Sequence, residues 1–175
     1  MRVLLTGGMG FIGSHTAVVL QEAGHEPVLF DNLSNADRGV SARIAAITGR
    51  APKFVEGDIR DEAALERVLR EERIEAVIHF AGLKAVGESV VKPLEYYDNN
   101  LIGTIRLLEA MRSAGVKRLI FSSSSTVYGT PKSLPLRETD PTGVATNPYG
   151  RTKLQIEEIL ADLAKADPEW SVICL

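Results

Sequence analysis

A tyrosine and a lysine four residues apart, Tyr149 and Lys153, are the side chains best suited to acid–base chemistry. On a helix, residues with this spacing lie on one face and are neighbours. A phenol, with an ordinary pKa of about 10, is a poor base at neutral pH. An ammonium group and the positive charge of a cofactor ring, each about 7 Å away, would contribute roughly 2 kcal/mol apiece at an effective dielectric constant of about 20. Together they would lower the pKa of a phenol by about three units, into the range that general-base catalysis prefers.

Other hydroxyl groups occur near this pair in the sequence. Four serines at residues 122–125 follow an apolar run. One of these hydroxyls can bond a substrate alcohol and pass its proton to Tyr149, although a serine run is more often only a polar loop. Tyr128 and Lys132 repeat the four-residue spacing, but the glycine and proline between them disfavour a continuous helix. We therefore assign Tyr128 to loop packing.

Three glycines near the start of the chain form a second motif, typical of nucleotide binding. Gly7, Gly10 and Gly13 lie between the apolar run 3–5 and a segment with a helical pattern. Such glycines let the backbone turn tightly, approach a pyrophosphate closely and pack the helix against its strand. The amide groups at the helix N-terminus then face the anion. In this strand–turn–helix context, the motif predicts a bound dinucleotide rather than a glycine-rich turn without a ligand.

Two aspartates indicate which dinucleotide is bound. Asp31 comes eighteen residues after Gly13, where a carboxylate accepts hydrogen bonds from the adenosine ribose diol and repels a 2′-phosphate. This position favours NAD over NADP as the cofactor. Asp58 follows a later strand-like run, and its carboxylate either pairs with the exocyclic amine of adenine or caps the next helix. The sequence leaves both interpretations of Asp58 open.

Alternating strand-like and helix-like runs would position these groups. Six strands joined by helices predict an α/β fold, a doubly wound parallel (Rossmann) sheet with helices on both faces. The ligand is then expected over the carboxyl ends of the strands, where the strand order reverses. The long irregular stretch 123–148 is expected to be functional. Strands are predicted at residues 2–6, 26–30, 53–56, 76–81, 118–122 and 171–175, and helices at residues 11–23, 40–48, 62–71, 93–113 and 149–165.

Length and composition fit one domain and argue against several classes of function. Of the 175 residues, 45% are hydrophobic and 25% are charged, which are ordinary values for a globular protein. A formal net charge of −3 gives no electrostatic reason to expect nucleic acid or an anionic membrane as a partner. We expect no signal peptide and no membrane-spanning segment, because the sequence shows no pattern for either.

The cysteine and histidine residues argue against a disulfide and against a metal site. The single cysteine, Cys174, excludes a disulfide within these residues, fits a reducing cytoplasm and is expected to pack in a buried strand. The histidines His15, His25 and His79 are not spaced as metal ligands, so no metal is expected. The sequence ends at Leu175, within or just after its last apolar run, which suggests a fragment.

Longer stretches of the chain resemble a known family. The glycine motif and the Tyr-x-x-x-Lys spacing are shared across the extended short-chain dehydrogenase/reductase family, which the chain resembles over its whole length. Residues 79–89 and 92–100 are more specific, and they resemble the UDP-glucose 4-epimerases within that family. The matching stretches are residues 2–16, 54–60, 79–89, 92–100, 121–129 and 148–150.

This resemblance implies functional roles at the matching positions. Tyr149, Lys153 and Ser124 would be catalytic, and Ser124 and Tyr149 would also bind the substrate. The glycine turn and the loops that follow the strands would bind NAD. The residues implied to contact NAD are Gly7, Gly10, Phe11, Ile12, Gly13, Asp31, Asn32, Leu33, Ser34, Asn35, Ala36, Asp58, Ile59, Phe80, Ala81, Gly82, Leu83, Lys84, Asn99, Tyr149 and Lys153.

The resemblance also implies a reaction, the NAD-dependent interconversion of UDP-galactose and UDP-glucose through transient oxidation at sugar C4. Tyr149, with or without help from Ser124, would remove the proton of the 4-hydroxyl while hydride passes to NAD. The keto sugar would swing about its pyrophosphate link, and hydride would return to its opposite face. A homodimer packed through helices 93–113 and 149–165 is implied as well, although packing on the sheet explains their apolar faces equally well.

Two alternative functions are a dehydratase of similar fold and an isolated NAD-binding module. Nucleotide-sugar 4,6-dehydratases of similar fold carry an Asp-Glu pair where this chain has Ser125 and Thr126. Neither side chain is a carboxylic acid, so elimination of water is disfavoured. The family also has a C-terminal region that binds the UDP-sugar, and the resemblance here covers the cofactor half, residues 1–175. An isolated NAD-binding module, or a truncated fragment without turnover, therefore remains an alternative.

Overall fold

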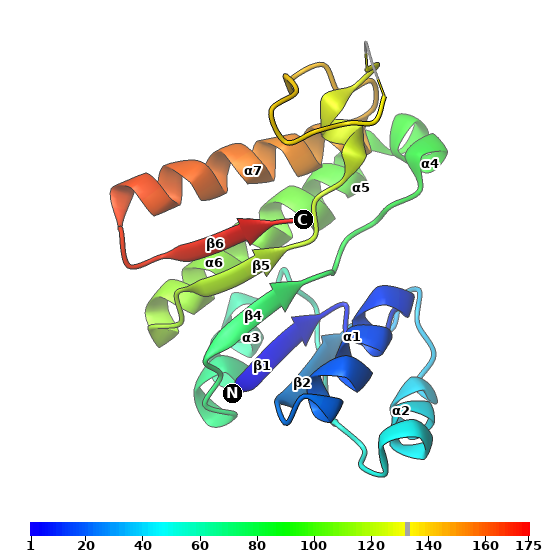
Figure 1. Ribbon diagram of the computed structural model, residues 1–175, viewed down its shortest axis with the longest axis vertical. Coiled ribbons are helices and arrows are strands. Elements are labelled where there is room, and N and C mark those ends of the chain that lie inside the picture. The colour runs from blue at the N-terminus through cyan, green and yellow to red at the C-terminus, as the bar shows by residue number, and fades with distance from the viewer. Residues whose placement is uncertain (132–133) are drawn as a thin grey trace.

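Six parallel strands form one sheet in the computed structural model, which describes residues 1–131 and 134–175 (Figure 1). Every pair of neighbouring strands runs parallel. The predicted fold class, a doubly wound parallel sheet, is therefore confirmed. In their order across the sheet, the strands are β3 (Lys53–Glu56), β2 (Glu26–Asp31), β1 (Arg2–Thr6), β4 (Ala76–His79), β5 (Arg118–Phe121) and β6 (Ser171–Cys174).

The strand order reverses at the centre of the sheet, between β1 and β4. The register places Thr6 of β1 beside Phe30 and His79, and it places His79 beside Phe121 of β5. The carboxyl ends of the four central strands therefore meet at one edge. In open sheets of this kind, ligands bind in the crevice outside that edge, at the point of reversal.

Helices cover both faces of the sheet, and each layer has its own apolar core (Figure 1). Side chains alternate between the faces along a strand. Leu5 and Leu29 pack with α1 and α2, whereas Leu4 and Val77 pack on the opposite face with α3, α6 and α7. These helices are α1 (Phe11–Glu22), α2 (Val40–Thr48), α3 (Glu62–Glu71), α6 (Gly103–Ala114) and α7 (Pro148–Ala166).

The helix predicted over residues 93–113 is continuous, but it is not α-helical throughout. A short helix α5 (Pro93–Tyr96) leads into a π-helical segment η1 (Tyr97–Ile102), and only then does α6 begin. The hydroxyl of Thr104 donates a hydrogen bond of 2.6 Å to the backbone carbonyl of Asn100, inside this segment. π-Helical segments of this kind are rare and occur frequently at functional sites.

Two further expectations differ from the structure. A six-residue helix, α4 (Val86–Val91), was not predicted, because its apolar run is too short to show a period. Cys174 was expected to be buried, but it is exposed. β6 lies at the edge of the sheet, and its neighbouring residue Ile173 is exposed as well. An apolar strand pattern therefore does not by itself imply that both faces of the strand are covered.

The irregular stretch 123–148 contains one short element, the 3₁₀-helix η2 (Ser125–Tyr128). Tyr128 ends this element and is half-buried, and the chain leaves it at Gly129. Lys132, the partner that the spacing suggested for Tyr128, lies outside the described residues. Among the described helices, none is both long enough and apolar enough to cross a membrane.

Candidate active site

The glycine turn between β1 and α1 is tightly closed. Gly7 has a φ of +67°, and its amide donates a hydrogen bond of 2.8 Å to the carbonyl of Phe30. A Cβ atom on Gly7 would lie 2.7 Å from the backbone nitrogen of Ala81, and one on Gly13 would lie 2.4 Å from the carbonyl oxygen of Gly7. Because no side chain fits in either place, the turn presents bare backbone at the carboxyl edge of the sheet.

The start of α1 is open to ligand at this turn. Gly10 is the N-cap and provides no side-chain hydrogen bond to the first turn. The amide groups of a first helical turn have no partners within the helix and favour an anion. Phe11 and Ile12 are 74% and 55% exposed, although both are large and apolar. The geometry therefore fits the pyrophosphate of a dinucleotide.

We expect Gly13→Ala to lower the affinity for NAD by about tenfold or more, since a 1–3 kcal/mol steric cost falls on the turn itself. Calorimetric titration with NAD measures this loss. Gly87→Ala is the matched control, because a Cβ at Gly87 meets no atom of the described residues within 4 Å. Equal affinity of the Gly13 variant and the wild type would show that the turn does not hold the pyrophosphate.

Asp31 lies directly beside the glycine turn, at the end of β2. Its carboxylate accepts hydrogen bonds from the backbone amides of Met9, at 3.1 Å, and Leu33, at 2.8 Å. Each oxygen thus has one backbone partner, and a carboxylate oxygen can accept about two hydrogen bonds. The remaining capacity suits a ribose diol, the role that the sequence predicts for Asp31.

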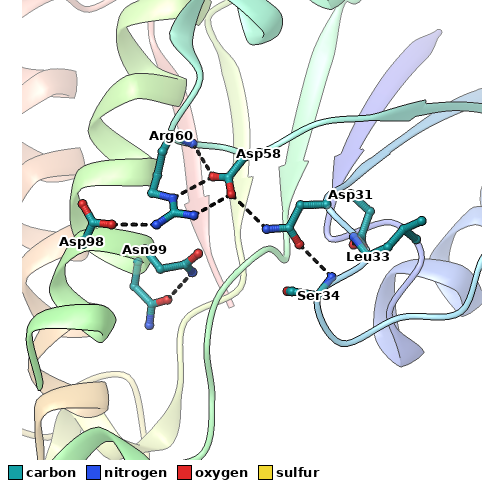
Figure 2. A network of polar contacts seen from close by, with 9 residues as sticks. Asp31, Leu33, Ser34, Asp58, Arg60, Asp98 and Asn99 are labelled. Carbon is teal, nitrogen blue, oxygen red and sulfur yellow. Dashed lines mark hydrogen bonds and ion pairs between the residues drawn. The ribbon is translucent and has the colours of Figure 1, made fainter. Parts of the chain in front are cut away.

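Asp58, two residues after the end of β3, is held by Arg60 and Asn32 (Figure 2). The neighbouring guanidinium holds the pKa of Asp58 well below its ordinary value, so the carboxylate is ionised. The helix-capping interpretation of Asp58 is wrong. Asp61 caps α3 instead, by accepting a hydrogen bond of 3.0 Å from the amide of Ala64.

Tyr149 and Lys153 share one face of α7, which begins at Pro148. The side chain of Asn147 caps the helix by accepting a hydrogen bond of 2.8 Å from the amide of Gly150. The ammonium of Lys153 lies 6.0 Å from the centre of the Tyr149 ring. At this separation a unit charge still acts with about 2–3 kcal/mol at an effective dielectric constant of about 20.

Lys153 is buried, with 5% of its surface exposed. Its ammonium donates a hydrogen bond of 2.7 Å to the carbonyl of Ser122 and lies 4.6 Å from the centre of the Phe121 ring. Burial lowers the pKa of Lys153 to about 8, while the carboxylate of Glu157 acts in the opposite direction. A cation that is poised near neutral pH can both stabilise a phenolate and exchange a proton.

Ser124 lies at the start of η2, close to the beginning of α7. Its hydroxyl oxygen accepts hydrogen bonds from the backbone amide of Thr126, at 3.2 Å, and from the hydroxyl of Thr126, at 2.9 Å. A Cβ on Gly150 would lie 3.2 Å from Thr126, so this segment packs directly against the helix that carries Tyr149. The hydroxyl proton of Ser124 is left available for another acceptor.

The loop after β4, which the resemblance assigns to NAD, is fixed by a buried asparagine. The Asn100 side chain accepts a hydrogen bond from the amide of Leu83 (2.8 Å) and donates one to its carbonyl (2.9 Å). The neighbouring Asn99 donates to the Asn100 oxygen at 2.9 Å. Ile59, by contrast, is buried and packs against Gly103, so its side chain belongs to the core.

A buried polar chain lies behind these groups, and the sequence analysis did not find its role. His79 is fully buried, and its ring nitrogens lie 2.6 Å from the hydroxyl of Thr6 and 2.9 Å from that of Thr104. The hydroxyl of Thr104 in turn donates a hydrogen bond to the backbone carbonyl of Asn100. This chain connects the end of β1 to the loop after β4. The sequence feature that could have indicated this chain is the presence of polar residues, such as Thr6 and His79, within apolar runs.

We expect His79 to make the fold sensitive to acid. Burial, and to a lesser degree the charge of Lys153, lower the pKa of His79 from 6.5 to about 3. Between these values the unfolded chain binds a proton that the folded chain does not, so stability falls as the pH falls, by about 1.4 kcal/mol per pH unit. Urea unfolding at pH 7, 6 and 5 measures this slope.

The variant His79→Gln is expected to flatten that slope, whereas His25→Gln, at a half-exposed site, is expected to keep it. An unchanged slope in the His79 variant would contradict the assignment.

No group of histidine, cysteine, aspartate and glutamate side chains that could hold a metal ion occurs in the described part of the chain.

The geometry combines a dinucleotide turn with a tyrosine–lysine pair, and comparison with known proteins identifies the family. Residues 3–175 match the family described as the NAD dependent epimerase/dehydratase family. The chain belongs to this family. The NAD cofactor expected from the sequence is thereby confirmed at the level of the family, and so is the resemblance on which the site residues were assigned.

Individual members of the NAD dependent epimerase/dehydratase family are closely similar to this chain. UDP-glucose 4-epimerases from Yersinia pestis and Mus musculus are 57% and 56% identical, over 100% and 99% of this chain and 52% of each relative. A crystal structure of UDP-glucose-4-epimerase from Stenotrophomonas maltophila, with bound NAD and formylated UDP-arabinopyranose, matches with a TM-score of 0.97 and 51% identity. The match covers 99% of this chain and 52% of that one. The chain spans about half the length of the relatives it matches.

Proposed function

We propose that residues 1–175 form the NAD-binding domain of an enzyme that interconverts UDP-galactose and UDP-glucose. The buried ammonium of Lys153, 6.0 Å from the centre of the Tyr149 ring, is the observation that carries this proposal. A cation at this distance stabilises the phenolate of Tyr149, which can then act as a base at the carboxyl edge of the sheet. The relatives that are named UDP-glucose 4-epimerases support the choice of substrate.

The order of strands supports the placement of NAD. The glycine turn follows β1, Asp31 follows β2 and Asp58 follows β3, and these strands are adjacent in the sheet. A dinucleotide with its pyrophosphate at the turn therefore lays its ribose at Asp31 and its adenine near Asp58. The nicotinamide end then points across β4, toward Tyr149 and Lys153.

The side chains of this domain would handle the proton of the sugar. Tyr149 accepts the proton of the 4-hydroxyl, directly or through Ser124, and returns it when the alcohol is formed again. Lys153 stabilises the phenolate, since its ammonium is fixed by the carbonyl of Ser122. NAD, when bound, supplies a nicotinamide that accepts hydride from sugar C4 and gives it back.

Epimerisation fits the site better than elimination of water. Elimination requires a second acid and base, and Ser125 and Thr126 provide no carboxyl group. Thr126 is already engaged, since its hydroxyl donates to Ser124. Within the NAD dependent epimerase/dehydratase family, the chain is therefore assigned to the epimerases.

Incubation of the complete protein with NAD and UDP-galactose, followed by NMR of the sugar anomeric protons, tests the proposal. UDP-glucose is expected to accumulate to equilibrium without net consumption of NAD. A folded protein that binds NAD but yields no UDP-glucose would contradict the enzymatic function and favour an NAD-binding module.

We also propose a cytoplasmic homodimer, in which the segment from α5 to α6 and helix α7 of each subunit pack together. Leu94 and Ile102 on the first segment are large, apolar and exposed, which supports this assembly. A single free cysteine suits a reducing compartment. Light scattering of the purified protein tests the assembly, and a monomer at micromolar concentration would contradict it.

A further inference from the structure

The carboxylate of Asp58 accepts four hydrogen bonds. Its Oδ1 accepts from the backbone amide of Arg60 and from the Nε of the same residue, both at 2.9 Å. Its Oδ2 accepts from a terminal guanidinium nitrogen of Arg60 at 2.7 Å and from the side-chain amide of Asn32 at 3.0 Å. A carboxylate offers about four acceptor positions. A further donor can bind Asp58 only if one of these partners leaves.

Arg60 is the partner held most firmly. Its guanidinium grips both oxygens of Asp58 in the bidentate geometry that is favourable for arginine and carboxylate. Its remaining terminal nitrogen donates a hydrogen bond of 2.7 Å to Asp98, which lies in η1 (Figure 2). The side chain of Arg60 therefore lies clamped between two carboxylates, and its departure would break contacts to both.

Asn32 is the partner held least firmly. Its amide is a neutral donor, its bond to Asp58 is the longest of the four, and the residue is exposed. The side-chain oxygen of Asn32 accepts a hydrogen bond of 3.1 Å from the amide of Ser34, which requires the NH₂ group to face Asp58. The carboxylate of Asp58 is itself partly accessible, since 27% of its side-chain surface is exposed.

We propose that the base of the cofactor is recognised by an exchange at Oδ2 of Asp58, in which the exocyclic amine of adenine takes the place of the Asn32 amide. This inference rests on the proposed binding of NAD, and it assigns to Asn32 a role in base selectivity. Arg60, clamped by Asp98, is the positioning residue that keeps the carboxylate in place during the exchange.

The exchange limits the binding free energy that the exocyclic amine of adenine contributes. One N–H···O bond to Asp58 is broken for each one formed, so the amine adds little net free energy. A base with a carbonyl oxygen at that position, such as hypoxanthine, cannot donate to Asp58. The retained Asn32 amide can donate to that oxygen instead. Asn32 therefore narrows the preference for adenine over hypoxanthine.

Calorimetric titration of nucleotide-free protein with NAD and with nicotinamide hypoxanthine dinucleotide tests the exchange. In the variant Asn32→Ser, a hydroxyl oxygen still serves the amide of Ser34, but the competing donor is lost. We expect the Kd for NAD to fall by about fivefold, whereas the Kd for the hypoxanthine dinucleotide stays the same or rises. Gln21→Ser, which removes an amide at the far end of α1, is expected to change neither Kd by more than about twofold.

The variant Asp58→Asn provides a second, independent measurement. We expect it to bring the ratio of the two Kd values to about one, because an amide can accept from an amine or donate to a carbonyl. An unchanged ratio in either the Asn32 or the Asp58 variant would overturn the exchange while leaving NAD binding intact. A wild-type protein that binds neither dinucleotide would instead overturn the proposed function, and the exchange with it.

Discussion

Replacing Tyr149 by phenylalanine is expected to lower turnover of UDP-galactose by about a thousandfold, the range typical of a lost general base. The ring remains in place, so packing at the start of α7 is kept, and only the hydroxyl that handles the proton is removed. Initial rates with saturating NAD and UDP-galactose measure the loss.

Tyr128→Phe is the matched control, because this tyrosine lies in η2 and is assigned to loop packing. It is expected to keep turnover within about threefold of the wild type. NAD affinity is expected to stay within about threefold in both variants. Full turnover in the Tyr149 variant would mean that another group removes the proton.

The second large effect is expected for Lys153→Met. Loss of a charge that acts with about 2–3 kcal/mol at 6.0 Å corresponds to a fall in turnover of about 30- to 150-fold at pH 7. Stopped assays of UDP-glucose formation measure this change. Lys165→Met is the control, since this lysine on the same helix has 77% of its side-chain surface exposed. Equal rates in the two variants would contradict the assigned role of Lys153.

Lys153→Met is also expected to change how the free energy of unfolding depends on pH. The pKa of Lys153 is about 8 in the folded chain, against an ordinary value of 10.5. Below pH 8 the ammonium is charged in both states, and its burial destabilises the fold in full. As the pH rises from about 8 to 10.5, the folded chain releases this proton first, so stability rises by about 3 kcal/mol. Urea unfolding across this range is expected to show the rise in the wild type and not in the Lys153 variant.

The sequence predicts the elements that follow local rules. Apolar runs and glycine turns locate all six strands of the described chain to within about two residues, and their alternation with helices predicts the parallel sheet. The four-residue spacing correctly places Tyr149 and Lys153 on one face of α7, because a helix fixes that geometry by itself.

What the sequence does not predict depends on contacts between distant segments. The carbonyl of Ser122 that fixes Lys153, and the hydroxyls of Thr6 and Thr104 on either side of His79, have no local signature. The π-helical segment η1 has no local signature in the sequence either, and its Asn100 side chain bonds the distant loop at Leu83. The role of Asn32 as a donor to Asp58 likewise appears only when β2 and β3 are placed side by side.

The central claim is that a phenol beside a buried cation acts on a sugar at the cofactor edge. A crystal structure of the complete protein with NAD and a UDP-sugar tests it most directly. The account predicts the hydroxyl of Tyr149 within hydrogen-bonding distance of the sugar 4-hydroxyl, with C4 facing the nicotinamide and the pyrophosphate at the glycine turn. A Tyr149 oxygen directed away from both, in a complex with the dinucleotide fully bound, would contradict it.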